Sequence, residues 1–297
     1  MTDTSPYSTI VTERIGKVER ITLNRPEKRN ALSPTLQDEI IHAVQAAERS
    51  GEVRVIVLRG AGPSFCAGYD INPQRNDSQE RRSLPVVGGA DGGDGQEHVR
   101  QMTVEEDVAM CISLGERWGK LWNCRIPVIA QVHGYCVAGG TDVALHCDMI
   151  IAAHDAQIGF PPVRAQGGPP THMWVYHAGP QWSKRLLLTG DFISGRRAAE
   201  VGLVLESVEA DALDDHVMSL AQRVALIPHD LLVHNKRVVN FGIELQGRTA
   251  MSMLGGIHDA LAHLAPEVAD FNQRLRADGV RVAVGERDAA FHPNLID

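Results

Sequence analysis

Two glycine-bearing turns, each of which follows an apolar run, constrain the fold of this chain most. Residues 65–70 follow the run 53–58, and residues 133–142 follow the run 127–132. Apolar runs of this length, bounded by turns, are typical of strands buried within a sheet. Glycine lets the backbone of such a turn approach a ligand closely, because it has no Cβ. Two such turns side by side can point two N–H groups at one oxygen, which is how proteins stabilise an oxyanion.

The second turn opens into a predicted helix, and strands and helices alternate through this half of the chain. A helix that begins at residues 139–141 adds the positive end of its dipole to the same spot. Paired strands are expected at 7–13 and 18–23, a helix from Ser33 or Pro34, and a helix over 103–122 followed later by a strand at 149–153. Further helices are expected at 183–188, 194–201, 213–226, 229–245, 251–264 and 266–277. The pattern predicts an α/β body over residues 1–205 and a helical region over 206–297.

The segment 72–98 interrupts this pattern, because it is polar and rich in glycine. Such a segment buries too little apolar surface to offset the entropy of ordering it. Apolar order resumes immediately after it. We therefore expect a flexible excursion within the first region.

Charge and composition narrow the class of protein. The chain has 297 residues, 43% of them hydrophobic, and a net charge of −8. An acidic chain of this size disfavours nucleic acid or an anionic membrane as a partner. The first six residues lack a cationic stretch followed by an apolar one, and no apolar run approaches the length that spans a membrane. Together with five scattered cysteines, these features lead us to expect a cytoplasmic protein.

The spacing of histidine and cysteine around the second turn does not predict a metal site. Residues 133, 136, 146 and 147 lack the paired closure of a zinc motif.

Six segments in register resemble the crotonase, or enoyl-CoA hydratase/isomerase, superfamily. They are residues 24–32, 64–71, 134–148, 156–162, 188–190 and 198–204. The resemblance implies a ClpP/crotonase-like spiral of ββα units with a helical C-terminal trimerisation region. It also implies an acyl-CoA thioester as substrate, no metal or redox cofactor, and assembly as a homotrimer or a homohexamer formed by two trimers.

Carried onto this sequence, the resemblance assigns the oxyanion hole to the backbone N–H groups of Tyr69 and Gly139. It implies that coenzyme A is bound by cationic side chains and by residues along the same wall. These are Lys28, Arg29, Ala31, Ala67, Asp70, Ile71, Tyr135, Pro161 and Lys236. The three cations would supply the local basicity that the acidic chain lacks overall.

The two carboxylates that a hydratase of this family uses do not both occur here. The first position matches Asp142, one methylene shorter than the usual glutamate. The second falls on Pro162, which has no side-chain proton to give or take. The loop 164–172 is the nearest source of another acid or base, and Arg164 and His172 are its candidates.

The resemblance favours an enoyl-CoA hydratase-like lyase that adds water syn to a 2-enoyl-CoA, with Asp142 as acid and base. Double-bond isomerisation, thioester hydrolysis or decarboxylation are alternatives, because Pro162 removes the second carboxylate. An alternative of another class is a non-catalytic acyl-CoA-binding protein or partner subunit.

Overall fold

The computed structural model describes residues 6–71 and 102–297, so the excursion expected at 72–98 lies outside the described residues. A six-stranded sheet forms the centre, in the order β1-β2-β3-β4-β6-β9. Its strands are β1 (Ile10–Ile15), β2 (Val18–Leu23), β3 (Val55–Gly60), β4 (Val128–Val132), β6 (Met149–Ala153) and β9 (Glu206–Val208). The first pair is antiparallel and the others are parallel. The near-continuous apolar runs of β3 and β4 are thus explained, since parallel strands are buried on both faces.

A second, smaller sheet has the order β10-β8-β7-β5. Its strands are β5 (Tyr135–Val137), β7 (Gln157–Gly159), β8 (Phe192–Ser194) and β10 (Leu295–Ile296). β5 directly follows β4, and β7 directly follows β6, so the chain alternates between the sheets as it winds through successive ββα units. Strands of two or three residues carry too little periodicity to be predicted from sequence.

Helices cover the sheets, and polar caps start several of them. Ser33 caps α1 by accepting the Leu36 amide, and Thr103 and Glu106 form a capping box at α2. The α-helices are α1 (Pro34–Arg49), α2 (Val104–Trp122), α3 (Gly139–Leu145), α4 (Trp174–Leu187), α5 (Gly195–Glu200), α6 (Leu213–Ala225), α7 (His229–Glu244), α8 (Arg248–Ala262), α9 (Pro266–Asp278) and α10 (Val280–Asp288). The 3₁₀ turns are η1 (Pro26–Lys28), η3 (Pro161–Arg164) and η4 (Ala289–Phe291). Helix α4 begins well before the predicted 183–188, and it is interrupted at Gly179, whose φ is 70°.

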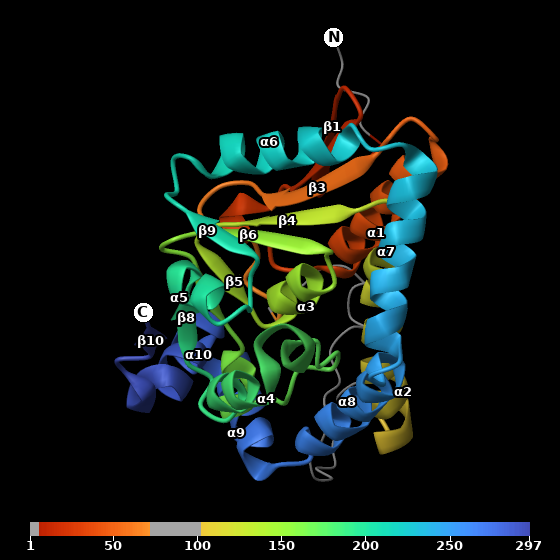
Figure 1. The fold of residues 1–297 in the computed structure, drawn as a ribbon. Helices are drawn as coiled ribbons and strands as arrows, with labels where there is room; N and C mark the ends of the chain where they lie inside the picture. Colours follow the sequence, from red (N-terminus) through yellow and green to blue (C-terminus); the bar gives the residue numbers. More distant parts are fainter. Residues whose placement is uncertain (1–5, 72–101) are drawn as a thin grey trace.

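The C-terminal helices surround the body (Figure 1). Helix α6 packs on the large sheet, α7 runs along one side, and α8 packs against α2. Leu213 and Val217 of α6 belong to the main hydrophobic core, and β10 pairs with β8. The division at 205/206 stays a prediction, since residues on both sides of it share one core. Within the described residues, none of the helices is both long and apolar enough to cross a bilayer.

Candidate functional site

The two glycine-bearing turns lie side by side. Cys66 and Cys136 form an isolated parallel β-bridge between the two turns. The Cys66 amide donates to the Tyr135 carbonyl (3.0 Å), and the Val137 amide donates to the Cys66 carbonyl (3.0 Å). On the opposite edge of the first turn, the Leu32 amide donates to the Gly68 carbonyl (2.8 Å), and the Asp70 amide donates to the Leu32 carbonyl (3.2 Å). These two bonds flank residue 69, so its own N–H points away from residue 32 and toward the second turn.

The second turn presents its amide through an unusual backbone conformation. Ala138 has a φ of 51° and precedes α3, so Gly139 is the first helical residue and its N–H has no acceptor within the helix. A Cβ built on Gly68 would lie 3.4 Å from the Gly139 nitrogen. Within residues 6–71 and 102–297, neither the Tyr69 nor the Gly139 amide donates a hydrogen bond. The arrangement can hold an anionic oxygen, and that use stays a prediction.

Asp142 is buried beside these amides and is held by two hydroxyl groups. Its Oδ1 accepts from the Thr171 hydroxyl (2.7 Å), and its Oδ2 accepts from the Tyr69 hydroxyl (3.2 Å). The Trp118 indole N–H donates to the Tyr69 oxygen (3.0 Å). Burial raises the pKa of Asp142 to about 7, although both hydroxyl bonds lower it. A carboxyl with this pKa can both accept and return a proton near neutral pH.

Glycine at position 139 leaves room for the Tyr69 ring. A Cβ there would lie 2.7 Å from the ring's Cε2 atom. The same tyrosine therefore supplies a backbone N–H to the turn and a hydroxyl to Asp142. Burial raises the pKa of this phenol well above its usual value, so the hydroxyl keeps its proton.

The structure does not bring Arg164 to Asp142. Its buried guanidinium pairs with Asp191 (3.2 Å) and Asp288 (3.0 Å) and lies over the Phe291 ring, 4.1 Å from the centroid. These contacts hold η3 against the C-terminal segment.

His172 lies next to the site but does not bond Asp142. Its φ is 48°, and its Cδ2 atom would be 2.7 Å from a Cβ built on Gly255 of α8. Burial lowers the pKa of its imidazole. The neighbouring Thr171 makes the hydrogen bond to the carboxylate instead.

The predicted coenzyme A residues near the first turn form one packed edge. Asp70 is buried and pairs with Arg25 (3.0 Å), which also donates to the Ala31 carbonyl (2.5 Å). The Ala67 amide donates to the Arg29 carbonyl (2.9 Å). Asp70 thus fixes the loop that carries Lys28 and Arg29, whose side chains are exposed.

The remaining wall residues fall into separate environments. Tyr135 lies under the Arg29 guanidinium, 5.3 Å from its ring centroid, and Pro161 is buried in η3. Ile71 packs against Phe271 and its neighbours in α9 and α10. The C-terminal helices therefore reach the same edge of the molecule.

Lys236 has a buried partner in the described structure. Its ammonium donates to Asp148 Oδ2 (2.7 Å) and to the Ile126 carbonyl (3.2 Å), and its side chain is 7% exposed. Burial raises the pKa of Asp148 and the lysine charge lowers it. The geometry gives Lys236 a structural partner, and phosphate binding by this residue stays a prediction.

Replacing Lys236 with methionine will destabilise the fold by about 3 kcal/mol, because it leaves the largely buried Asp148 carboxylate without its cation. Chemical denaturation at pH 7 measures this change. The double variant Lys236→Met/Asp148→Asn should recover part of the loss. Unaltered stability combined with a raised KM for acyl-CoA would instead show that the lysine serves the ligand.

Sequence reasoning missed several residues that hold the site. Trp118 bonds Tyr69 from α2, Thr171 bonds Asp142 across 29 residues, and Arg25 pairs with Asp70. A buried tryptophan needs a partner for its N–H, but the sequence does not reveal which one. These contacts join distant segments and leave no local signal.

Comparisons with known proteins agree with this geometry. The family model described as enoyl-CoA hydratase/isomerase matches residues 13–85 and 89–264. A hydroxycinnamoyl-CoA hydratase-lyase of Pseudomonas fluorescens is 30% identical over 222 residues, covering 73% of each chain. The chain resembles the crystal structure of an enoyl-CoA hydratase from Mycobacterium smegmatis, with a TM-score of 0.85 and 35% identity over 97% of this chain and 95% of that one.

A second solved structure gives the same result. An enoyl-CoA hydratase/isomerase from Xanthobacter autotrophicus Py2 has a TM-score of 0.83 and 33% identity, over 96% of this chain and 99% of that chain. The predicted spiral fold is therefore confirmed. With the family model spanning most of its length, and with both turns in place, the chain belongs to the enoyl-CoA hydratase/isomerase family.

Proposed function

We propose that this protein acts on an acyl-CoA thioester through an enolate, with Asp142 as its single acid–base group. The observation that carries the proposal is a buried carboxyl, with a pKa raised by burial to about 7, beside two amides that donate to no described residue. Lys28 and Arg29, at the exposed edge of the first turn, are suited to bind the nucleotide end.

In the hydratase reaction, the thioester oxygen accepts from the Tyr69 and Gly139 amides. Asp142 takes a proton from water as the water oxygen bonds to the β carbon. Electrons move to the thioester oxygen, and the amides stabilise the resulting enolate. The Asp142 carboxyl then gives its proton to the α carbon, on the same face. One carboxyl thus completes a syn addition, and no metal or redox cofactor is required by these steps.

Double-bond isomerisation is the second candidate, and Pro162 favours it. The Pro162 carbonyl accepts the amides of Ala165 (3.1 Å), Gln166 (2.7 Å) and Gly167 (3.1 Å), so this position shapes a turn. Isomerisation needs no activated water, because one base removes the α proton and returns it to the γ carbon. A single carboxyl is sufficient for it.

Product analysis in ¹⁸O-labelled water separates these reactions. We expect crotonyl-CoA and longer 2-enoyl-CoA esters to gain the label at the β carbon. Label-free movement of the double bond in a 3-enoyl-CoA would favour isomerisation. Tight binding without turnover of any ester, including saturated and malonyl-type esters, would overturn the catalytic proposal in favour of a binding protein.

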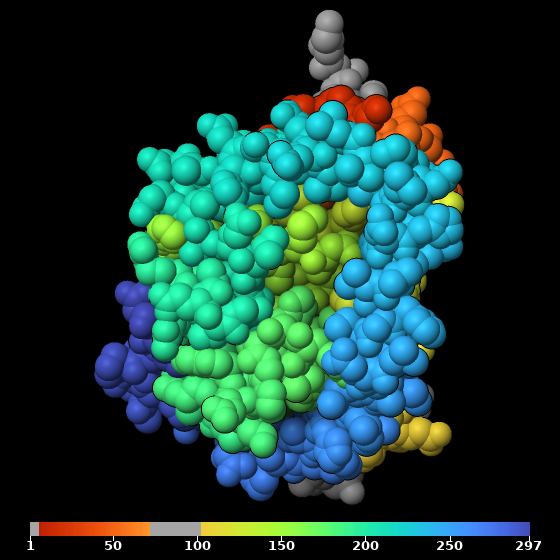
Figure 2. Space-filling model, viewed as in Figure 1, coloured from red at the N-terminus to blue at the C-terminus, as the bar shows by residue number. Residues whose placement is uncertain are grey.

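We also propose that the chain self-associates through α7. Leu231, Val238, Phe241 and Leu245 recur at spacings of seven, three and four residues, and each is more than half exposed. This spacing places them on one stripe of the helix surface. Figure 2 shows that α7 and α8 border a hollow on this face. An apolar stripe of this length suits a second copy of the chain in a trimer or hexamer.

The variant Phe241→Asp will dissociate this assembly, since it places a charge at the centre of the stripe. Light scattering coupled to size exclusion gives the mass of each species. Gln273→Asp, an exposed position on α9, is the matched control and should leave the mass unchanged. A monomeric wild-type protein would contradict the proposal.

The five cysteines are free and buried, which supports a cytoplasmic location as part of this proposal.

A further inference from the structure

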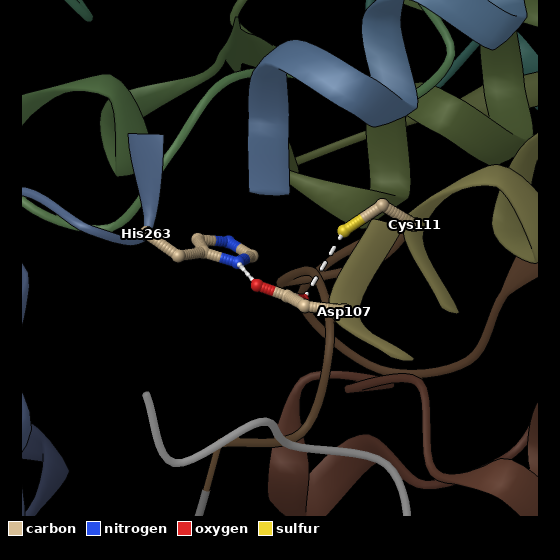
Figure 3. A group of neighbouring side chains, drawn as sticks. All are labelled: Asp107, Cys111 and His263. Carbon is tan, nitrogen blue, oxygen red and sulfur yellow. Dashed lines mark hydrogen bonds and ion pairs between the residues drawn. The ribbon is translucent and has the colours of Figure 1, made fainter. Parts of the chain in front are cut away.

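A buried group of ionisable side chains joins α2 to α8 next to the site (Figure 3). Asp107 and Cys111 are one turn apart on α2, and Asp259 and His263 occupy equivalent positions at the end of α8. His263 Nδ1 lies 2.8 Å from Asp107 Oδ2, and its Nε2 lies 3.5 Å from Asp259 Oδ1. The imidazole therefore bridges two carboxylates.

The two carboxylates and the imidazole of this group shift one another's pKa. The pKa of His263 would fall through burial, but its hydrogen bond to Asp107 and the charge of Asp259 raise it. One imidazole thus faces two carboxylates. Burial raises the pKa of Asp259 to about 6, and the charge of His263 lowers it.

Asp259 is also attached to the loop that leads to Asp142. Its Oδ1 would lie 2.3 Å from a Cβ built on Gly167, so the carboxylate lies directly against the backbone of this loop. Four residues farther along, Thr171 donates to Asp142. The loop thus contacts Asp259 at Gly167 and bonds the site carboxyl, Asp142, through Thr171.

The charge of Asp259 raises the pKa of Asp142, in the same direction as burial does. Other titratable groups face Asp142 but are kept neutral by burial, which raises the pKa of a phenol or thiol and lowers that of an imidazole. They are Tyr69, Cys66, Cys136 and His146.

From this placement we propose that Asp259 is a positioning residue of the acyl site. Held by His263, which also bonds Asp107, it lies against the loop at Gly167 and adds a second carboxylate to the surroundings of Asp142. The inference rests on the proposed function for its catalytic consequence. Asp259 compensates in part for the missing carboxylate at Pro162, because its negative charge makes Asp142 a stronger base.

The substitution Asp259→Asn separates charge from anchoring, since the amide keeps the size of the side chain and its contact with Gly167. We expect the rising limb of kcat/KM to move to lower pH and the plateau to fall, because Asp142 becomes a weaker base. Asp259→Ala also removes the anchor, and should lower kcat by about tenfold or more. Asp270→Asn, an exposed carboxylate on α9, is the matched control and should change neither.

A titration that needs no substrate keeps this test independent of the proposed function. Carboxyl ¹³C NMR of aspartate-labelled protein follows Asp142 directly, with Asp142→Asn assigning its signal. A downward shift of its pKa in Asp259→Asn supports the proposal even if no ester is turned over. An unchanged Asp142 titration and pH profile would overturn it, and a loss of thermal stability alone would make the group merely structural.

Discussion

Asp142→Asn will lower kcat/KM on the preferred acyl-CoA by about a thousandfold, within the range that general acid–base groups contribute. The amide keeps the size of the side chain but cannot take a proton. Because the oxyanion amides are untouched, binding of the ester should change little. Steady-state kinetics with the purified variant measures both effects. Turnover within a few-fold of wild type would remove Asp142 from the mechanism.

The pH dependence of the melting temperature will test whether Asp142→Asn loses activity through its chemistry or through a damaged fold. Asp142 has a folded pKa of about 7, above the value of about 4 for an exposed aspartate. A raised carboxyl pKa means that stability is lost as pH rises from about 4 through 7. The asparagine variant lacks this penalty. Its melting temperature relative to wild type should therefore increase between pH 5 and pH 8.

Gly68→Ala will reduce kcat by about a hundredfold or more through the oxyanion clamp. Gly68 has a φ of +97°, and an added Cβ would lie 2.7 Å from the Ala138 Cβ and 3.1 Å from the Val137 carbonyl oxygen. The two turns must separate to relieve this contact. The amides of Tyr69 and Gly139 would then no longer converge at the same distance.

Gly51→Ala is the control for Gly68→Ala. Its φ is +70°, so it carries similar backbone strain, but no atom lies within 4 Å of the added Cβ. We expect a stability loss of about 1 kcal/mol with kcat unchanged. If Gly68→Ala behaves in the same way, contact between the turns has no bearing on catalysis.

The sequence predicted those features whose signals are local. Apolar runs located β3 and β4, and Ser33 and Ser194 begin α1 and α5 as expected of caps. The helix from Gly139 follows from its turn and apolar pattern. Periodicity and capping depend on neighbouring residues, so a single sequence carries them.

Contacts between distant segments could not be predicted in this way. Thr171 bonds Asp142, which lies 29 residues earlier in the chain, whereas His172, which has the more reactive side chain, lies against Gly255 of α8. The family resemblance assigned Lys236 to a cation that binds coenzyme A. In the structure its ammonium contacts Asp148, which is 88 residues away. Side-chain type indicates what chemistry is possible, but tertiary packing decides which atoms meet.

Hydrogen–deuterium exchange at the α carbon of a saturated acyl-CoA, followed by NMR in D₂O, tests the central claim most directly. The measurement detects the enolate itself, whichever product the enzyme makes. The predicted result is exchange by the wild-type protein that Asp142→Asn abolishes and Gly68→Ala strongly slows. Absence of exchange in the wild type, with binding of the ester demonstrated, would contradict the account.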